Sequence, residues 1–534
     1  MPAQPYPLLI KQLLVTPIQQ ASSAEIVYRE RRHSYPEFIT RIARLGSALT
    51  ALGARPGMRI AVLDWDSHRY LECYFAIPML GAVLMTANPR LSPEQLLYTL
   101  DHSGAEILLV HPDFIPLVEG IRARLPKLRA LIALPDDGVI PPGFLCAGEY
   151  EALLAEADPG FVFAEFDENT TATQFYTTGT TGHPKGVSFS HRQIVLHTLA
   201  LMANVMLASR NGRLSRETVY LPITPMFHVH AWGIPYLATL AGMKQVYPGR
   251  YTPAGIAAIF AREGVTFSHC VPTILNMLLA APEFRDLDLS RWQVIIGGSA
   301  FPRGLAEAAL ARGIDAYAGY GMSETCPVLS LAQLKPGLAD DDAVRARTSA
   351  GLPSVFVELQ VVDEAMNPLP RDGAHAGEVV ARAPHLTAGY VGNDAASEAL
   401  WAGGWLHTGD IGVIGADGYL RITDRAKDVI KTGGEWVSSL DLEDLVSRHP
   451  DVGEVAVIGV TDAKWGERPM ALVVAKPGHA IDPESVRRYL FAEAEKGVIS
   501  RFAVPERIEC VEALDKTSVG KLDKKRLRAR FGGA

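Results

Sequence analysis

The sequence predicts an α/β fold for most of the chain, followed by a smaller α+β domain. Up to about residue 330, short apolar runs alternate with amphipathic stretches, which is typical of α/β layers with largely parallel sheets. From about residue 351, short strands separated by Asp-Gly or Gly-Asp turns dominate, and a compact mixed pattern follows "DRAKD" (424–428). We therefore expect an N-terminal domain over residues 1–426, with a β-rich subdomain over about 351–426, and a C-terminal domain over 427–534.

The elements of the first region are predicted from their periodicity. Four apolar runs look like interior strands, at residues 59–65, 105–111, 218–223 and 293–298. Three amphipathic stretches that end at glycine look like helices, at residues 93–104, 251–264 and 303–313. Ser190 and Gln193 fit a capping box, which predicts that a further helix begins beside them.

The two smaller units are predicted from shorter segments. Three strand-like runs make up the β-rich subdomain, at residues 357–363, 377–384 and 409–424. Five segments make up the α+β pattern of the C-terminal domain, at residues 439–450, 452–460, 469–478, 484–497 and 506–514. A unit of about 105 residues is large enough to fold as a separate domain.

Composition excludes several classes of function. The 534-residue chain has 51 basic and 59 acidic side chains, and its net charge of −8 gives no global basic field for nucleic acid. Five scattered cysteines without CxxC spacing are expected to be free thiols in a reducing cytosol. The longest apolar tracts, at residues 74–89 and 194–208, are interrupted or fall short of the ~20 residues that span a bilayer. We expect a cytoplasmic protein without an integral membrane segment or a secretory signal.

The stretch "YTTGTTGHPKG" (176–186) predicts a loop that holds phosphate. It is not the common ATP-binding loop, because Pro184 precedes Lys185 and Gly186 follows it. Glycines let backbone amides turn inward, threonine hydroxyls add donors and the lysine adds a positive charge. A flexible surface loop is the alternative, but threonine suits flexibility poorly. The residues expected at phosphate are Thr177, Thr178, Gly179, Thr180, Thr181, Gly182 and Lys185.

Four further motifs follow this loop in order along the chain. They are "GYGMSETCP" (319–327), "GWLHTGDIG" (404–412), "ITDRAKDVIKTGGEWVSS" (422–439) and "LDKTSVGKLDKKRLR" (514–528). With the loop, they make nearly the whole chain resemble the acyl- and aryl-CoA synthetases of the adenylate-forming superfamily, which includes luciferases and the adenylation domains of peptide synthetases. "PMFHVHAWGIPY" and "VIIGGSAFPRGL" resemble segments of the bacterial medium- and long-chain fatty acyl-CoA synthetases. The resemblance implies two mixed or parallel α/β sheet layers plus a β-barrel-like subdomain, and a small mobile C-terminal domain.

The resemblance also implies a two-step reaction that uses ATP, Mg²⁺ and coenzyme A. A carboxylate attacks the α-phosphate of ATP and releases pyrophosphate, and the thiol of coenzyme A then attacks the acyl-AMP and releases AMP. Because the first step joins two anions, positive charge is needed where they meet. Lys521 matches the family lysine that bridges the carboxylate and the α-phosphate. Without the family pattern, it would be one lysine of a solvated basic tail.

Other residues match family positions around the nucleotide. Glu324 matches the magnesium ligand, and Thr180 is expected to complete the protein's share of the metal site. Tyr320 matches the residue that stacks on adenine. Asp410 and Arg425 match residues that reach the ribose, although an Asp in "TGD" alone would suggest a turn. Besides the phosphate loop, the set expected at the nucleotide is Gly298, Ser299, Ala300, Gly319, Tyr320, Gly321, Met322, Thr325, Asp410 and Arg425, with Thr325 at the α-phosphate.

The resemblance places coenzyme A at "KTGGEW" (431–436). Lys427 occupies the hinge position, where family members carry Asp or Lys. Rotation there would move Lys521 away and bring this segment to the site, so that one domain serves both half-reactions. Two glycines would leave room for the thiol arm. The residues expected at coenzyme A are Lys431, Gly433, Gly434, Glu435 and Trp436.

The acid is expected to lie beside His228, Trp232 and Gly321. His228 matches a position that lines the acyl pocket and helps to admit the carboxylate, so we group it with Lys521 and Glu324 as catalytic. Trp232 resembles the tryptophan that gates the fatty-acid tunnel, and a core aromatic side chain is the alternative. "FHVH" (227–230) would also suit a metal pair on a strand, but no third ligand is near in sequence.

The leading hypothesis is a ligase that joins medium- or long-chain fatty acids to coenzyme A. One alternative is a coenzyme A ligase for a short, sulfur-containing (methylthiopropionate-like) or aryl acid. Another is an acyl-AMP ligase that delivers its product to a separate carrier protein or oxidase. A binding protein without catalysis conflicts with the joint presence of Lys185, Glu324, Asp410, Arg425 and Lys521. The expected partners are small molecules, namely the carboxylic acid, ATP and coenzyme A, and relatives suggest a homodimer through the N-terminal region.

Overall fold

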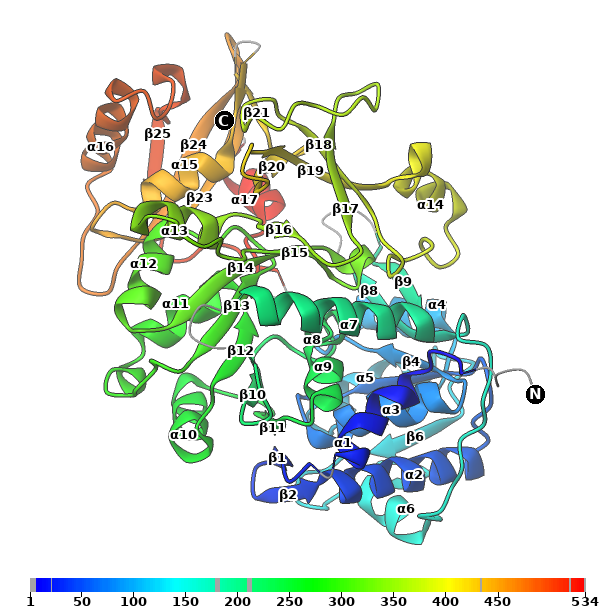
Figure 1. Cartoon of the computed structure of the whole chain (residues 1–534). Helices are drawn as coiled ribbons and strands as arrows, with labels where there is room; N and C mark the ends of the chain where they lie inside the picture. The colour runs from blue at the N-terminus through cyan, green and yellow to red at the C-terminus, as the bar shows by residue number, and fades with distance from the viewer. Residues whose placement is uncertain are drawn as a thin grey trace.

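The computed structural model describes residues 6–20, 22–177, 183–208, 214–432, 435–517 and 520–532. Its strands form four sheets, and the chain is an α/β protein with a smaller C-terminal domain, as the sequence predicts. Two lobes, coloured blue to cyan and green in Figure 1, lie side by side, with the yellow subdomain and the orange-to-red C-terminal domain above them.

A seven-stranded sheet forms the first lobe, in the order β7-β6-β5-β3-β4-β8-β9. Its neighbouring strands run parallel, except that β8 and β9 run antiparallel on either side of the glycine-rich loop. The strands are β3 (Arg59–Leu63), β4 (Val83–Thr86), β5 (Ala105–Val110), β6 (Ala130–Ala133), β7 (Gly148–Glu149), β8 (Thr171–Thr177) and β9 (Lys185–Ser190). The helices are α1 (Val15–Gln19), α2 (Tyr35–Ala51), α3 (His68–Met79), α4 (Pro93–Ser103), α5 (Ile115–Arg122) and α6 (Tyr150–Glu156).

A nine-stranded sheet forms the second lobe, in the order β16-β15-β14-β13-β12-β10-β11-β1-β2. The run from β14 to β1 is parallel, and antiparallel strands close both edges. The strands are β1 (Glu25–Tyr28), β2 (Arg31–Ser34), β10 (Val219–Pro222), β11 (Lys244–Tyr247), β12 (Phe267–Cys270), β13 (Gln293–Gly297), β14 (Asp315–Gly321), β15 (Val328–Leu331) and β16 (Leu352–Pro353). The helices are α7 (His191–Ala208), α9 (Ile234–Leu240), α10 (Pro253–Glu263), α11 (Pro272–Ala280), α12 (Arg303–Ala311) and α13 (Asp340–Thr348).

The predicted elements of these lobes are found where the periodicity places them. β3, β5, β10 and β13 fall inside the four apolar runs, and α4, α10 and α12 fall inside the three helical stretches. Gly104 and Gly264 close α4 and α10 in the left-handed conformation that favours glycine. The capping box is also confirmed, because Ser190 N donates to Gln193 Oε1 (2.8 Å) and Gln193 N donates to Ser190 Oγ (3.3 Å).

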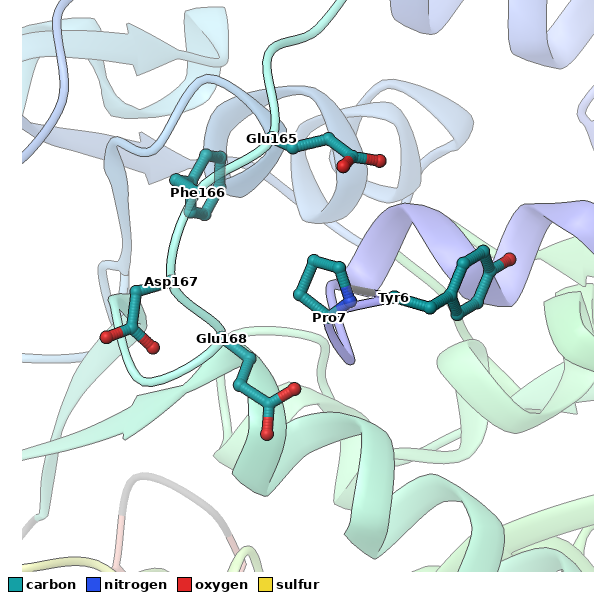
Figure 2. A pocket seen from close by; sticks show the side chains of 6 residues that line it. All are labelled: Tyr6, Pro7, Glu165, Phe166, Asp167 and Glu168. Atoms are coloured by element: carbon teal, nitrogen blue, oxygen red, sulfur yellow. The ribbon is translucent and has the colours of Figure 1, made fainter. Parts of the chain in front are cut away.

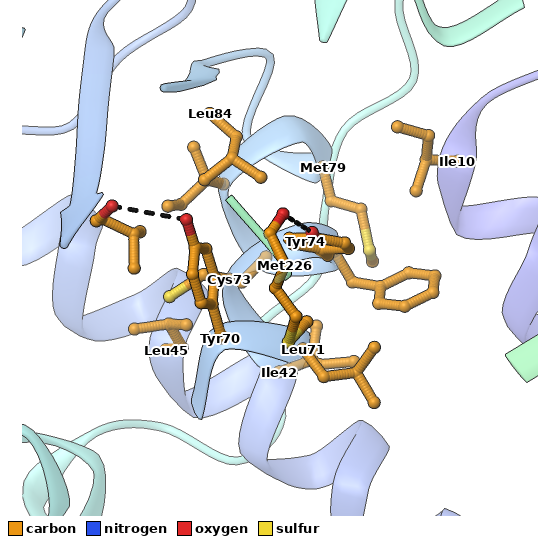
Figure 3. Close-up of a cluster of buried hydrophobic side chains, with 14 of the residues drawn as sticks. Ile10, Ile42, Leu45, Tyr70, Leu71, Cys73, Tyr74, Met79, Leu84 and Met226 are labelled. Atoms are coloured by element: carbon orange, nitrogen blue, oxygen red, sulfur yellow. Dashed lines mark hydrogen bonds between the residues drawn. The ribbon is translucent and has the colours of Figure 1, made fainter. Parts of the chain in front are cut away.

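Helix α3 lies in the main core between the lobes. Each of its residues is buried, and the helix contacts β1 of the nine-stranded sheet as well as β3 and β4 of the seven-stranded sheet. Figure 3 shows its side chains Tyr70, Leu71 and Tyr74 packed beside Met226 of the second lobe. Within the residues described above, we find no helix with the length and apolarity that crossing a bilayer requires.

Two smaller sheets complete the chain. The β-rich subdomain is a four-stranded antiparallel sheet of β17 (Glu358–Val362), β18 (Gly377–Arg382), β19 (Leu406–Ile414) and β20 (Leu420–Arg425), with α14 (Asp394–Leu400) beside it. The C-terminal sheet contains β21 (Ile430–Thr432), β22 (Glu435–Val437), β23 (Val452–Asp462), β24 (Gly466–Ala475) and β25 (Arg507–Cys510), with α15 (Ser439–Ser447), α16 (Pro483–Glu495) and α17 (Lys524–Phe531). Helix α15 contacts both α12 and β20, which ties the C-terminal domain to the rest of the molecule.

Candidate active site

The carboxyl ends of parallel strands form the edge on which the site is built. β12, β13 and β14 pair in parallel, with Gly297 opposite Gly319, so the segments that follow these strands meet at one edge of the sheet. Ligands of α/β sheets bind at this edge. Gly321, at the end of β14, lies so close to the next segment that a Cβ atom would be 1.8 Å from Pro327 O. Only glycine therefore fits this position.

Tyr320, Asp410 and Arg425 come together from two sheets. Asp410 on β19 lies opposite Arg425 on β20, and Arg425 Nε is 3.3 Å from Asp410 Oδ1. The Tyr320 hydroxyl on β14 donates to Asp410 Oδ2 (2.8 Å). Burial raises the pKa of Asp410, while Arg425 and Tyr320 oppose this shift. Together, these three residues form a polar and partly charged wall, and the ring of Tyr320 is its aromatic part.

Glu324 lies just after β14, next to the strand that follows the glycine-rich loop. Its side chain is buried, and the Tyr390 hydroxyl donates to Glu324 Oε1 (2.7 Å). Lys185 Nζ, at the start of β9, is 4.4 Å from the centroid of the Tyr390 ring. Burial raises the pKa of Glu324, whereas Tyr390 and Lys185 lower it. The seven-stranded sheet thus contributes positive charge beside this carboxyl group.

The surroundings of Glu324 fit a magnesium ion held by few protein ligands. Mg²⁺ prefers oxygen ligands and retains several waters, so one carboxylate and one hydroxyl beside substrate phosphates are suitable. Glu324 supplies the carboxylate, whereas Thr180, the predicted hydroxyl ligand, lies outside the described residues. In the part of the chain that the structure describes, no three His, Cys, Asp or Glu side chains gather into a metal centre.

Lys521 reaches the same edge from the C-terminal domain. Thr273 Oγ1 on α11 donates to Gly520 O (3.0 Å), which holds the residue before Lys521 against the second lobe. Gly298, with a φ of +82°, leaves room for the lysine, because a Cβ atom there would be 2.9 Å from Lys521 Cε. The last predicted motif and the turn after β13 are therefore in contact, although they are more than two hundred residues apart in sequence.

The charge of Lys521 depends on the residues around it. Burial lowers the pKa of Lys521 to about 8. The positive charge of Arg425 contributes to this lowering, and the carboxyl groups of Asp410 and Glu324 oppose it. The amino group is therefore a cation at neutral pH and loses its proton in mildly alkaline solution.

His228 precedes a left-handed turn, which differs from the strand that "FHVH" suggests. The short element α8 (Val229–Trp232) has φ angles between +47° and +59°, and Gly233 follows at +76°. The left-handed conformation costs about 1–2 kcal/mol per L residue, so these four residues store on the order of 4–8 kcal/mol. The turn also directs His230 into an aromatic cluster, 5.2 Å from the Phe175 ring, so the alternating geometry behind a metal pair is not formed.

The side chain just before the turn and the last side chain within it differ in polarity. Burial, together with the positive charges of Lys521 and Arg90, lowers the pKa of His228 to about 3. His228 is therefore neutral at physiological pH. Trp232 is buried, and its ring would lie 3.1 Å from a Cβ atom on Gly297. The turn thus places a neutral imidazole and an indole ring near the lysine.

Several predicted nucleotide residues have structural roles in this conformation. The buried Thr325 hydroxyl lies within hydrogen-bonding distance of both Met322 O (3.0 Å) and Pro327 O, and its one proton donates to either, which shapes the turn after β14. Ser299 and Ala300 follow Gly298 at exposed positions. Contact of Thr325 with the α-phosphate stays a prediction.

The segment predicted at coenzyme A forms a hairpin in the C-terminal sheet. Lys431 on β21 pairs with Trp436 on β22, and Lys431 N donates to Glu467 Oε2 (3.0 Å). β21 contacts β22, β23 and β24, so the hairpin packs within its own sheet, while Lys521 lies beside Gly298, one of the residues predicted at the nucleotide. The predicted site residues that lie outside the described ranges are Thr178, Gly179, Thr180, Thr181, Gly182, Gly433 and Gly434.

Lys427 lies at the junction between β20 and β21, where the hinge is predicted. Beside it, Arg528 Nη2 is 2.6 Å from Asp428 Oδ1. Across the junction, Ser439 N at the start of α15 donates to Asp424 Oδ2 (2.7 Å). The contact between Ser439 and Asp424 crosses the domain boundary and stabilises the orientation in which the C-terminal domain brings its lysine to the site.

Three residues at the candidate site come from distant segments and were not predicted from the sequence. Tyr390 contacts Glu324, Thr273 holds the residue before Lys521, and Arg90 adds positive charge near His228. None of these residues belongs to a motif whose chemistry is recognisable from spacing. Only the fold places them at the site.

A separate cavity of about 500 Å³ lies at the start of the chain. Tyr6, Pro7 and residues 165–168 line it, and Figure 2 shows the acidic side chains of Glu165, Asp167 and Glu168 around it. None of the predicted site residues lines this cavity, so it is distinct from the candidate active site.

Comparison with known families gives two matches that together cover most of the chain. Residues 17–391 match the family described as "AMP-binding enzyme", and residues 441–521 match "AMP-binding enzyme C-terminal domain". Both ranges contain predicted site residues, including Tyr320 in the first and Lys521 in the second.

Curated relatives align over nearly their whole length. A long-chain-fatty-acid–CoA ligase of Thermus thermophilus is 42% identical over 94% of this chain and 92% of its own. A 3-methylmercaptopropionyl-CoA ligase of Ruegeria pomeroyi is 37% identical over 91% of this chain and 90% of its own. A medium-chain-fatty-acid–CoA ligase of Ectopseudomonas oleovorans is 35% identical over 96% and 93%, respectively.

Solved structures show the same architecture. The anthranilate CoA ligase AuaEII in complex with anthranoyl-AMP superimposes with a TM-score of 0.88 at 26% identity, covering 99% of this chain and 98% of that one. A fatty acyl CoA synthetase of Mycobacterium tuberculosis superimposes with a TM-score of 0.72 at 27% identity, covering 98% of both chains.

Proposed function

Since this chain belongs to the family of AMP-binding enzymes, we propose that it joins medium- or long-chain fatty acids to coenzyme A with ATP as the energy source. The chain is an AMP-forming acyl-CoA synthetase. The observation that carries the proposal is the approach of Lys521 to the edge formed by Gly298, Tyr320 and Asp410. A cation at this edge suits a reaction between two anions.

In the first half-reaction, the acid's carboxylate attacks the α-phosphate of ATP. The ammonium group of Lys521 would lie between the two anions and reduce their repulsion, and its stabilisation grows as negative charge gathers in the transition state. Lys185 would contact the outer phosphates from β9. When Mg²⁺ is bound, Glu324 and the Thr180 hydroxyl would hold it, and it would neutralise part of the phosphate charge.

The nucleoside would lie against the wall formed by β14 and β19. The Tyr320 ring would stack on adenine. Asp410, held by Tyr320 and Arg425, would accept hydrogen bonds from the ribose hydroxyls. A charged acceptor makes stronger hydrogen bonds than a neutral one, so the ionised form of Asp410 favours binding.

The second half-reaction needs a different face of the C-terminal domain. Rotation at Lys427 would break the contact between Ser439 and Asp424 and withdraw Lys521. The β21–β22 hairpin, with Lys431, Gly433, Gly434, Glu435 and Trp436, would then reach the site and guide the thiol of coenzyme A to the acyl carbon. The thiol sulfur forms the thioester bond, and AMP leaves with the electrons of the acyl–phosphate bond.

The acid would bind beside His228, Trp232 and Gly321. His228 is neutral and Trp232 is apolar, so this pocket suits an acyl chain with its carboxylate turned toward Lys521. Relatives whose names specify long-chain, medium-chain and methylmercaptopropionyl substrates all align over most of this chain. A short, sulfur-containing or aryl acid is therefore the second candidate.

The proposal also covers the cellular compartment and the oligomeric state of the enzyme. All five cysteines are free thiols, which fits a reducing cytoplasm. A homodimer through the N-terminal region is the assembly we propose. Sedimentation of the purified protein tests this assembly, and a monomer at micromolar concentration would contradict it.

A substrate panel tests the proposed function. Straight-chain acids from C2 to C18, together with aryl and methylthio acids, are each incubated with ATP, Mg²⁺ and coenzyme A. We expect pyrophosphate, AMP and the thioester in equal amounts, with the highest kcat/KM for a medium- or long-chain acid. Acyl-AMP without thioester would instead identify an acyl-AMP ligase that delivers to a carrier protein or oxidase.

A further inference from the structure

The left-handed turn is held by three side chains that have no other role in the proposed reaction. Asp66 Oδ1 accepts a hydrogen bond from Met226 N (2.7 Å), and the Tyr74 hydroxyl donates to Met226 O. Thr86 Oγ1 donates to Phe227 O (2.9 Å). These bonds satisfy the N–H and C=O groups of Met226 and the C=O group of Phe227, so they fix the backbone that enters the turn.

All three anchors belong to the first lobe, whereas the turn belongs to the second. Asp66 lies between β3 and α3, Tyr74 is on α3, and Thr86 ends β4. Figure 3 shows Tyr74 bonded to Met226 in the packed core, with Tyr70 one turn earlier on the same helix and bonded elsewhere. The turn is therefore supported by contacts between the lobes.

Two features indicate a role for Asp66 beyond packing. The side chain is only 5% exposed, and an ionised carboxylate is rarely placed in such surroundings unless it is bonded or paired. Burial raises the pKa of Asp66 to about 7, whereas the bond from Met226 N and the positive charge of Arg90 oppose this shift. The Arg90 guanidinium lies 5.9 Å from the Phe227 ring. An acidic and a basic side chain thus flank the backbone that leads to His228.

We propose that Asp66 and Tyr74 are positioning residues, which hold Met226 so that the strained turn presents His228 and Trp232 to the acid. This inference rests on the proposed function. Four L residues in the left-handed region relax once their supports are removed. Relaxation moves the imidazole before the turn and the indole within it together, while Asp410 and Tyr320 on other strands stay in place.

Matched variants separate positioning from general loss of stability. Tyr74→Phe removes the hydroxyl that holds Met226, and Tyr70→Phe removes a buried hydroxyl of the same helix that donates to Val62 O (3.4 Å). Asp66→Ala removes the second anchor, and Asp66→Asn keeps an oxygen that can accept the bond. Asp64→Asn is the matched control, because Asp64 is also buried but bonds to Ser67 and Trp65 and faces Arg69 at 4.0 Å.

The KM values for acid and ATP are measured separately for each variant. Loss of a hydrogen bond of this kind corresponds to about tenfold, so we expect Tyr74→Phe and Asp66→Ala to raise the KM for the acid by about that factor. The KM for ATP should stay within about twofold, which purely structural damage would not achieve. Asp66→Asn should recover part of the loss, and Tyr70→Phe and Asp64→Asn should match the wild type.

Equal increases in both KM values, or a normal KM for the acid in both Tyr74→Phe and Asp66→Ala, would overturn the proposal. If those variants do not fold, Thr86→Val removes the third anchor with little change in volume and is judged by the same criteria. If the wild type activates no acid, the proposed function fails, and a crystal structure of Tyr74→Phe decides the positioning role. Retention of the left-handed φ angles at residues 229–232 in that variant would refute it.

Discussion

Replacement of Tyr320 by Phe gives a direct test of the nucleotide site. The change keeps the ring expected beside adenine and removes the hydroxyl that donates to Asp410 Oδ2 at 2.8 Å. Asp410 is only 7% exposed, so water compensates poorly for the lost bond. A hydrogen bond to a charged group contributes about 1.5–3 kcal/mol, which corresponds to about 10- to 150-fold.

Pyrophosphate exchange at varied ATP concentration is the appropriate assay. We expect Tyr320→Phe to lower kcat/KM for ATP by about 10- to 150-fold, with little change in the KM for the acid. The pH profile should also change. Burial raises the pKa of Asp410 and Tyr320 opposes that shift, so without the hydroxyl the pKa rises further. Because the ionised carboxylate is the better acceptor, the acidic limb of kcat/KM should move to higher pH.

Tyr317→Phe provides the control on the same strand. Tyr317 is fully buried, and its hydroxyl has no hydrogen-bond partner among the described residues. This variant should therefore behave like the wild type. The reasoning is wrong if Tyr320→Phe retains wild-type kcat/KM for ATP, or if Tyr317→Phe loses as much.

Three further predictions concern the lysine and the core. Lys521→Ala should slow pyrophosphate exchange by about 10²–10³-fold, yet form thioester from supplied acyl-AMP nearly normally; equal slowing of both steps would contradict the division of labour. Because the pKa of Lys521 is lowered to about 8, kcat/KM for adenylation should fall as pH rises through that value, and a flat profile up to pH 10 would exclude the lysine as the required cation. Arg347→Met should lower the free energy of unfolding by about 3–5 kcal/mol, because it removes the guanidinium that pairs with the buried Asp315 carboxyl group at 2.5 Å; urea unfolding measures this change, and an unchanged midpoint would contradict a stabilising role of the pair.

The elements were predictable where local signals and the final fold agree. The interior strands β3, β5 and β13 are apolar apart from one polar residue near the start of each, Arg59, Glu106 and Gln293, because parallel sheets covered on both faces need no polar alternation. Gly104 and Gly264 mark the ends of α4 and α10, because left-handed caps favour glycine. These signals lie within a few residues of the element that they define.

The site was predictable only as far as motifs extend. Tyr320, Asp410 and Lys521 were singled out by resemblance, but the hydrogen bond between Tyr320 and Asp410 depends on how two sheets meet. Tyr390 contacts Glu324 across 66 residues, a separation at which spacing carries no information. The turn at residues 229–233 was missed for a different reason, because its conformation opposes the intrinsic preference of its residues and is imposed by neighbours.

The left-handed turn at residues 229–232 also links the heat stability of the protein to its proposed selectivity among acids. Val229, Ala231 and their neighbours occupy a conformation in which glycine or asparagine is more comfortable. Variants selected in the laboratory only for thermal stability would gain by such replacements, since each would relieve backbone strain in the folded chain. Variants selected for selectivity among acids would lose that selectivity by the same replacements. Under the proposed positioning role, the same few residues therefore limit how much heat stability can be gained before selectivity among acids is lost.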